Sequence, residues 1–240
     1  MLSVKGISKS FDGFLAVNRV SFDVAEGEIL GLIGPNGSGK STTFNVIAGT
    51  LRPTGGSIAF EDREIAGLPA HRICRMGLAR TFQIPRPFRR LSLRENVTLA
   101  AFYGSRGVAS RAEAEAHAVA ALDLVGLPND PDATIEGLGA AQLKKIELAR
   151  ALATRPKLLL ADESLGGLDH AEMERAADML GRIRRDLGIT IVWVEHIMGV
   201  LMRVVDRVIV LDHGELIFEG SPQNAAKDAR VAEVYLGRSR

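Results

Sequence analysis

The chain has 240 residues, of which 46% are hydrophobic, and its 30 basic and 29 acidic residues leave a net charge of +1. This composition excludes a disordered chain, and the length suits one large domain or one core with a helical insert. The balanced charge gives no reason to expect nucleic acid as a partner. Because Cys74 is the single cysteine, no internal disulfide can form, and we expect a reducing compartment.

No targeting or membrane-spanning segment is predicted. Residues Met1 to Ser10 contain no long apolar stretch, so they do not resemble a secretory signal. The longest apolar runs, such as Leu158–Ala161 and Val208–Leu211, are far shorter than the roughly 20 residues that cross a bilayer. If the protein works at a membrane, we expect other chains to span it.

Strand-like and helix-like stretches alternate in the first 60 residues, which favours an α/β domain. We predict strands at Leu2–Ile7 and Val20–Val24, and an apolar run at Glu28–Ile33 that ends in a glycine-rich turn. A helix at Lys40–Gly49 and a short strand at Ser57–Phe60 follow.

The middle of the chain has a helical pattern, from about Leu93 to Ala153. Alanine-rich stretches such as Arg111–Leu124 and few β-branched residues indicate a helical subdomain inserted into the core. We therefore predict one domain over residues 1–240, with an α/β core at 1–92 and 154–240 and the helical subdomain at 93–153. The elements predicted after the insert are a strand at Lys157–Ala161, a helix at Ala171–Leu187, a strand at Ile189–Val194, a hairpin of Val208–Leu211 and Glu215–Phe218 around His213-Gly214, and a tail helix at Asp228–Gly237.

A phosphate-binding loop is predicted where the apolar run ends. The segment Gly34-Pro35-Asn36-Gly37-Ser38-Gly39-Lys40-Ser41 matches the P-loop pattern G-x-x-x-x-G-K-[ST], between a strand and a helix as the pattern requires. Glycines let backbone N–H groups surround phosphate oxygens, and the helix N-terminus favours the anion. We expect Lys40 to reach the β- and γ-phosphates, Ser41 to hold Mg²⁺, and Thr42 to contact the nucleotide as well. A glycine-rich turn without a ligand is the competing interpretation, and the strand–helix context argues against it.

Two adjacent carboxylates follow the predicted strand at Lys157–Ala161. Such a strand delivers them to its C-terminal edge, where open α/β sheets bind ligands. We expect Asp162 to bind magnesium, through water, and Glu163 to act as general base on the attacking water. Asp-Glu after a strand is by itself often only a helix cap, and the P-loop is what favours the catalytic interpretation.

Beyond these two motifs, the chain resembles the ABC ATPase family over nearly its full length. Gln83 resembles the family's Q-loop glutamine, Gly167-Leu168-Asp169 its D-loop, and His196 its switch histidine, while Phe11 stands where the family has an aromatic that stacks on adenine. Each feature alone is more often structural, and only their order makes the match specific. The resemblance implies an α/β P-loop core with an N-terminal antiparallel β subdomain and an inserted helical subdomain. It also implies that Gln83 contacts the metal, that His196 contacts the γ-phosphate, and that Asp169 lies at a dimer contact.

The family's signature motif, L-S-G-G-Q, corresponds here to Leu138-Gly139-Ala140-Ala141-Gln142. Gly139 replaces the serine that hydrogen-bonds the γ-phosphate of the opposite subunit's ATP, a loss of about 1.5–3 kcal/mol. Ala141 replaces a glycine and adds a Cβ where backbone and phosphate meet. In the family, two such domains dimerise head to tail around ATP. We hypothesise a heterodimer with one better and one poorer site.

Within the family, the chain resembles one of the two ATPases of branched-chain amino acid importers. The residues that carry this resemblance are Gly77 to Gln83, Phe88, Leu91, Glu95-Asn96-Val97, Glu195-His196-Ile197-Met198 and Val234-Tyr235-Leu236-Gly237. It implies ATP and Mg²⁺ as ligands and, as partners, a second ATPase, two membrane-spanning permease subunits and, indirectly, an external solute-binding protein. It also implies a peripheral position on the cytoplasmic face of the inner membrane. The proline- and arginine-rich loop Ile84 to Arg90 is expected to dock the permease, or else is a solvated connector.

Three other classes of protein fit less well. The ABC ATPases of chromosome maintenance and translation carry long coiled coils or two ATPase domains, and the chain has one P-loop and no sustained heptads. A small P-loop kinase would not explain Gln83, Gly167-Leu168-Asp169 and His196 in this order. A nucleotide-binding regulatory subunit that hardly hydrolyses ATP is favoured by the altered signature, although Glu163 and His196 argue against it.

Overall fold

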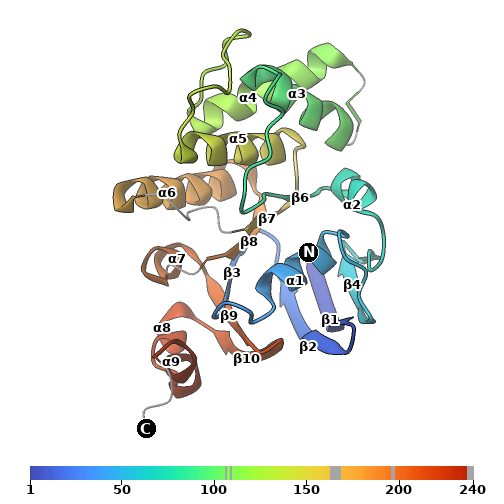
Figure 1. Cartoon of the computed structure of the whole chain (residues 1–240), viewed down its shortest axis with the longest axis vertical. Coiled ribbons are helices and arrows are strands. Elements are labelled where there is room, and N and C mark those ends of the chain that lie inside the picture. The colour runs from blue at the N-terminus through green and yellow to red at the C-terminus, as the bar shows by residue number, and fades with distance from the viewer. Residues whose placement is uncertain (106, 109, 163–168, 196–197, 237–240) are drawn as a thin grey trace.

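The structure, a computed structural model, describes residues 1–105, 107–108, 110–162, 169–195 and 198–236. Its strands form two sheets, and helices lie above and beside them (Figure 1). The fold is α/β, as the sequence predicts. None of the described helices is long and apolar enough to cross a membrane.

The larger sheet has six strands in the order β10-β9-β3-β8-β7-β6. Neighbouring strands from β9 to β6 are parallel, and β10 pairs antiparallel with β9. Because β3 lies inside the sheet, the turn that follows it opens at the carboxyl edge, where the parallel strand β7 also ends, on the far side of β8. The strands are β3 (Ile29–Ile33), β6 (Leu78–Arg80), β7 (Leu158–Asp162), β8 (Thr190–Val194), β9 (Arg207–Asp212) and β10 (Glu215–Gly220).

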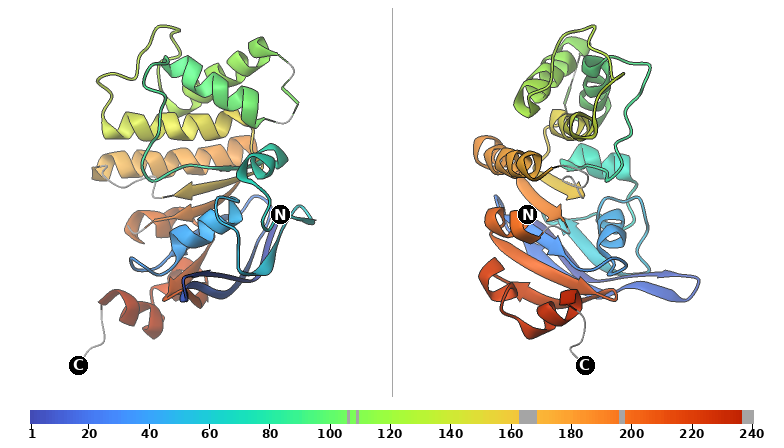
Figure 2. Two further views of the ribbon diagram at one scale, coloured as in Figure 1. Left: turned by 45° about the vertical axis from the view of Figure 1, so that its right-hand side comes forward. Right: turned by 60° about the vertical axis from the view of Figure 1, so that its left-hand side comes forward.

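The smaller sheet is antiparallel, in the order β2-β1-β4-β5. It comprises β1 (Leu2–Phe11), β2 (Phe14–Val24), β4 (Gly55–Phe60) and β5 (Arg63–Glu64). The β1–β2 hairpin projects from the body of the molecule (Figure 2, right). Both strands are longer than predicted, because register shifts in β1 let polar residues continue the pairing as far as Phe11 and Phe14.

Alternate residues of the central strands face two different cores, as the period of two in a strand requires. Leu30 and Leu32 of β3 face the antiparallel sheet and helix α1 (Lys40–Ile47). Ile29 and Ile33 face the opposite core, which contains most of the other helices. Both faces of this sheet are therefore covered, and its strands read as continuous apolar runs.

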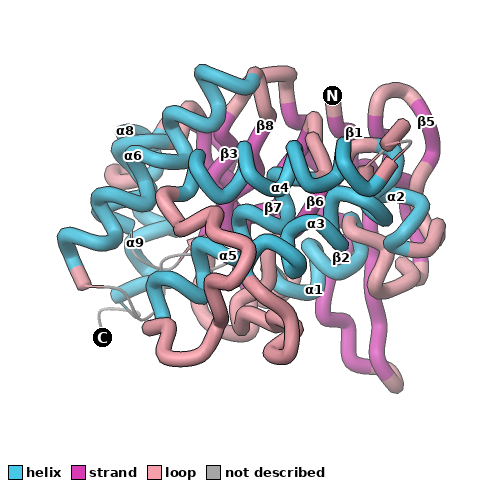
Figure 3. Tube along the Cα trace, turned by 90° about the horizontal axis from the view of Figure 1, so that it is seen from above, coloured by secondary structure: helices cyan, strands magenta, loops and turns pink. Residues whose placement is uncertain are grey.

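Three helices between β6 and β7 pack against one another and form a layer at one end of the molecule (Figures 1 and 2). They are α3 (Leu93–Gly104), α4 (Arg111–Val125) and α5 (Ala140–Ala153). Small residues such as Ala114, Ala118 and Ala149 are fully buried, which lets the helices approach closely. Seen from above, this helical layer lies over the strands β6 and β7 (Figure 3). The remaining helices are α2 (Ala70–Met76), α6 (His170–Leu187), α7 (Met198–Val204), α8 (Pro222–Ala225) and α9 (Ala229–Leu236).

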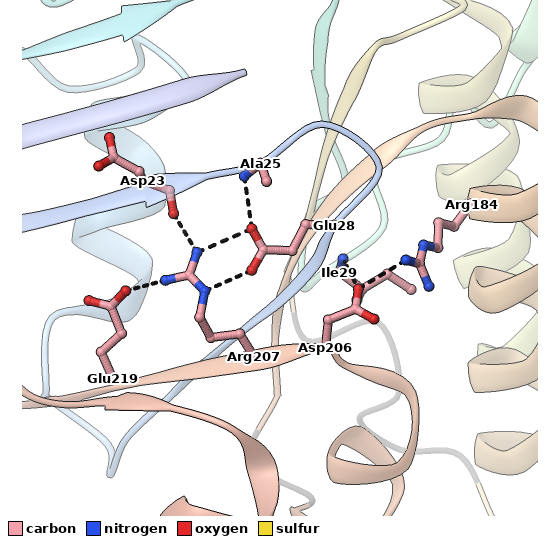
Figure 4. Close-up of polar contacts among 8 residues, drawn as sticks. All are labelled: Asp23, Ala25, Glu28, Ile29, Arg184, Asp206, Arg207 and Glu219. Carbon is pink, nitrogen blue, oxygen red and sulfur yellow. Dashed lines mark hydrogen bonds and ion pairs between the residues drawn. The ribbon is translucent and has the colours of Figure 1, made fainter.

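An ion-pair network fixes the entrance to β3 (Figure 4). The Arg207 guanidinium donates to both carboxylate oxygens of Glu28, at 2.8 and 3.1 Å, and also pairs with Glu219 and the Asp23 carbonyl. Nearby, the Asp206 carboxylate accepts the Ile29 N–H at 2.9 Å. The network ties β9 and β10 to the start of the strand that carries the glycine-rich turn.

Replacing Arg207 with methionine is expected to lower the free energy of unfolding by about 1–3 kcal/mol, because the largely buried Glu28 carboxylate loses a two-pronged, charge-assisted partner. Chemical denaturation measures the change. The matched control is Arg111→Met, which removes an exposed pair with Glu115 and should cost well under 1 kcal/mol. Equal effects of the two substitutions would contradict this role for Arg207.

Candidate functional site

The glycine-rich turn between β3 and α1 has the backbone of a phosphate loop. Gly34, Gly37 and Gly39 have φ of 150°, 82° and 101°, values that favour glycine. Asn36 and Gly37 are exposed at the tip of the turn. A Cβ on Gly34 would lie 2.2 Å from the Leu211 carbonyl oxygen, so the turn packs tightly against the end of β9.

The side chains of the turn and of the start of α1 differ in how far they are buried. Lys40 is buried, and its Nζ donates to the carbonyls of Gly34 and Pro35 at 2.8 and 2.9 Å. This arrangement holds an ammonium group inside the loop. The Ser38 hydroxyl is buried without a hydrogen-bond partner among the described residues, whereas Ser41 is exposed and Thr42 half-buried.

Asp162 ends β7 and is buried beside the P-loop helix. Its carboxylate Oδ2 accepts from Arg80 Nη2 at 2.7 Å, and its backbone N–H donates to Thr81 Oγ1 at 3.0 Å. Within the described residues, Oδ1 has no hydrogen-bond partner. A buried carboxylate oxygen without a partner is costly, so this atom is available to a cation or to a metal-bound water.

Four of the predicted site residues lie outside the described part of the chain, namely Glu163, Gly167, Leu168 and His196. Asp169 is described, and it caps helix α6: its carboxylate accepts the Glu172 N–H at 2.7 Å, and the Glu172 carboxylate accepts the Asp169 N–H at 3.0 Å. This reciprocal capping accounts for Asp169 within one chain.

Phe11 and Gln83 lie at the surface, Phe11 at the end of strand β1 and Gln83 in a loop. Phe11 closes the β1–β2 hairpin opposite Phe14, with 41% of its surface exposed and Lys9 Nζ 4.9 Å from the ring centre. The same hairpin reaches the P-loop, because a Cβ on Gly39 would lie 2.7 Å from the Ala16 carbonyl oxygen. Gln83 is exposed, three residues after the end of β6 at Arg80.

The segment aligned with the signature motif starts helix α5, in the helical layer and apart from α1 (Figures 1 and 2). Gly139 is the N-cap residue, with φ −73°, and its N–H donates to Gln142 Oε1 at 3.0 Å. Leu138 packs partly on the core, and Ala141 is half-buried. Ala140 and Gln142 are exposed. A Cβ on Gly139 would meet only Gln142 Oε1, at 3.9 Å, so a serine fits there without strain.

Helix α5 also holds the loop that follows Gln83. Arg150 donates to the Arg86 carbonyl at 2.8 Å and lies 5.3 Å from the centre of the Phe88 ring. Glu147 is buried and pairs with Arg150 at 3.1 Å. Burial raises the pKa of Glu147, while Arg150 and Arg86 oppose this shift.

We expect Glu147→Gln to stabilise the protein more at pH 7 than at pH 4. A carboxyl whose pKa is raised by folding contributes stability that is present below its unfolded pKa and lost as the pH rises through its folded pKa. Glutamine removes that loss because it stays neutral. Urea denaturation at both pH values measures the change, with Glu136→Gln at an exposed position as control. An equal effect of Glu147→Gln at both pH values would contradict the prediction.

Comparison with known proteins decides the family. The model of the ABC transporter family matches residues 17–166. The chain belongs to the ABC transporter family. It is 35% identical to the high-affinity branched-chain amino acid transport ATP-binding protein LivG of Salmonella typhimurium, over all of this chain and 98% of that protein. It is 34% identical to BraF of Pseudomonas aeruginosa, with the same coverage.

Solved structures of ABC transporter cassettes share the whole fold. The crystal structure of the ADP conformation of MJ1267, an ATP-binding cassette of an ABC transporter, has a TM-score of 0.89 and 29% identity, and 99% of each chain is covered. A dimeric structure of the cassette MJ0796 has a TM-score of 0.83 and 27% identity, with 92% of this chain and 99% of that one covered. This ABC transporter cassette is therefore a nucleotide-binding ATPase, as its sequence predicts.

Sequence reasoning missed Arg80 and Thr81 as neighbours of Asp162. Ala79-Arg80-Thr81 belongs to the segment that resembles the importer ATPases, but that resemblance assigns no role to Arg80 or Thr81, and only the pairing of β6 with β7 brings them to the carboxylate. The same reasoning missed Arg150, because its contact with Arg86 joins residues 64 positions apart in the sequence.

Proposed function

We propose that this ABC transporter cassette is the ATP-hydrolysing subunit that energises an importer of branched-chain amino acids or related small polar solutes. Similarity to LivG over the full chain is the observation that carries the proposal. This chain works with a second ATPase and two permease subunits, on the cytoplasmic face of the membrane. An external binding protein delivers the solute to the permease from the other side.

The residues of the site suit a magnesium nucleotide. The glycine-rich turn offers backbone N–H groups, Lys40 offers a buried ammonium, and Ser38 Oγ and Asp162 Oδ1 are buried without partners in the described part of the chain. Residues Gly34 to Thr42 hold the phosphates, and Phe11 stacks on the base. Ser41, Gln83 and Asp162 hold Mg²⁺, which when bound neutralises charge on the phosphate oxygens.

The other predicted site residues act in hydrolysis or in contacts between subunits. Glu163 accepts a proton from the attacking water and so makes its oxygen a better nucleophile for the γ-phosphorus. His196 donates a hydrogen bond to a γ-phosphate oxygen and stabilises its charge. The segment Leu138 to Gln142 and Asp169 lie at the contact with the second subunit. The loop from Ile84 to Arg90, in which the side chains of Ile84 and Phe88 are exposed, docks the permease.

The proposal is tested by solute uptake in bacterial cells that lack the gene for this chain but keep its permease and binding protein. Radiolabelled leucine should accumulate when the wild-type chain is restored, and not when Lys40→Ala is restored at the same level. Normal leucine uptake without the chain would contradict the assignment to branched-chain amino acids. Assay of other small polar solutes in the same cells would then identify the cargo.

The altered signature leads to a separate prediction. Gly139→Ser combined with Ala141→Gly is expected to raise the ATPase rate of the purified chain by about tenfold. The new hydroxyl restores a hydrogen bond to a charged group, worth about 1.5–3 kcal/mol. The N-cap geometry accepts serine without strain, and Ala141→Gly in the first turn of α5 should cost at most about 1 kcal/mol, so the double variant should still fold. The matched control is Gly55→Ser, away from the motif, where an added Cβ would meet only Ser8 Cβ, at 4.0 Å. An unchanged rate in the double variant would count against a weakened signature and against the heterodimer hypothesis.

A further inference from the structure

Arg80, at the end of β6, connects the two halves of the candidate site. Its Nη2 donates to Asp162 Oδ2 at 2.7 Å, and its Nη1 donates to Asn45 Oδ1 at 2.6 Å. Asn45 belongs to α1, the helix that begins at the P-loop lysine. One rigid guanidinium therefore holds the carboxylate on β7 and the phosphate-loop helix in one geometry.

The Arg80 side chain is itself held in place. It is 9% exposed, and its Cζ lies 5.2 Å from the centre of the Phe82 ring and 5.9 Å from that of Phe44. A guanidinium covered by aromatic rings and bound at two of its nitrogens has little freedom to turn. It can therefore fix the orientation of the groups that it binds.

The residue after Arg80 holds the backbone of Asp162. The Thr81 hydroxyl accepts the Asp162 N–H at 3.0 Å, and the Thr81 N–H donates to the Leu160 carbonyl at 3.0 Å. Two consecutive residues therefore hold Asp162: Arg80 binds its carboxylate Oδ2, and Thr81 binds its backbone N–H. Oδ1 is the carboxylate oxygen left without a partner among the described residues.

We infer that Arg80 is a positioning residue that holds Asp162 Oδ2, so that Oδ1 stays available to the metal ion of the bound nucleotide. This inference rests on the proposed function, in which Asp162 holds that metal. Partners that orient metal-binding carboxylates typically contribute 10- to 100-fold to metal affinity.

Two effects of removing Arg80 oppose each other. Loss of a positive charge would strengthen the attraction between Asp162 and a cation, whereas loss of the two-pronged anchor would let the carboxylate rotate and the α1 contact open. We expect the second effect to win, because Arg80 binds Asp162 and Asn45 at once and no other described side chain holds Oδ2.

The test is a titration of Mn²⁺ into the purified chain with saturating ATP, followed by electron paramagnetic resonance. Arg80→Met should weaken Mn²⁺ binding at least tenfold, and Arg80→Lys, which keeps the charge and one donor, should recover part of that loss. Affinity for ATP in the presence of a chelator should stay within twofold of wild type. The matched control is Arg111→Met, an exposed arginine that should leave both affinities unchanged.

The other outcomes separate this inference from the proposed function. Mn²⁺ affinity within twofold of wild type or tighter in Arg80→Met would overturn the positioning role, provided that Asp162→Asn weakens it. If Asp162→Asn itself leaves Mn²⁺ affinity unchanged, the metal role of Asp162 in the proposed function is wrong, and the inference about Arg80 fails with it. If thermal denaturation shows that Arg80→Met is not folded, Arg80→Lys provides the test. Wild-type Mn²⁺ affinity in Arg80→Lys would overturn the inference, and a weaker Mn²⁺ affinity would support it.

Discussion

Replacing Glu163 with glutamine is expected to slow steady-state phosphate release by at least about 100-fold, because a positioned general base contributes roughly 10²- to 10⁴-fold to such a reaction. Glutamine keeps the size of the side chain but cannot accept the proton of the attacking water. Affinity for ATP should change little, since Glu163 acts on water rather than on the nucleotide. Phosphate release and equilibrium ATP binding, measured on the same preparation, separate these two effects.

The matched control for this prediction is Glu26→Gln, an exposed carboxylate in the turn before β3. It should hydrolyse ATP at the wild-type rate. Hydrolysis by Glu163→Gln at more than about a tenth of the wild-type rate would show that another group serves as base. The assignment of Glu163 would then be wrong, while the P-loop assignments would stand.

Gly34→Ala is expected to weaken nucleotide binding at least tenfold and to lower the free energy of unfolding by about 2–6 kcal/mol. The added Cβ would lie 2.2 Å from the Leu211 carbonyl and 2.5 Å from Ser38 Oγ, at a φ of +150°. Overpacking costs about 1–3 kcal/mol and a strained backbone about 1–3 kcal/mol more. The loop must shift to relieve the collision, and its N–H groups then no longer converge on a phosphate.

Gly188→Ala separates the collision from the backbone strain. Gly188 caps helix α6 with a φ of +65°, and its Cβ would meet nothing within 4 Å. This substitution should cost about 1 kcal/mol and leave ATP affinity unchanged. If Gly34→Ala were no more destabilising than Gly188→Ala and bound ATP normally, the tight packing of the P-loop would not be essential for binding.

The central strands and the α/β class could be predicted because their sequences are continuous apolar runs of the right length. Strand β8 begins one residue after the predicted start at Ile189, and β7 is shifted by one residue from the predicted Lys157–Ala161. The short elements α2 and β6 were not predicted, since β6 has three residues and α2 has only seven, with His71, Arg72 and Arg75 interrupting its apolar ones. Their structure depends on packing with distant residues, which the local pattern does not contain.

The P-loop could be predicted from sequence because its chemistry lies in eight consecutive residues. The surroundings of Asp162 could not, since Arg80 and Thr81 reach it across 82 and 81 positions of the chain. Asp169 shows the opposite difficulty. The family resemblance implies a contact between subunits, whereas the single chain shows a helix cap for the same carboxylate.

The most direct test of ATP hydrolysis at this site is steady-state phosphate release by the purified wild-type chain, with and without Mg²⁺, beside Lys40→Ala. Phosphate release should saturate with ATP, require Mg²⁺, and be lost in Lys40→Ala, because the buried ammonium is the loop's own counter-charge to the phosphates. Phosphate release that persists in Lys40→Ala, or that needs no divalent cation, would contradict the account.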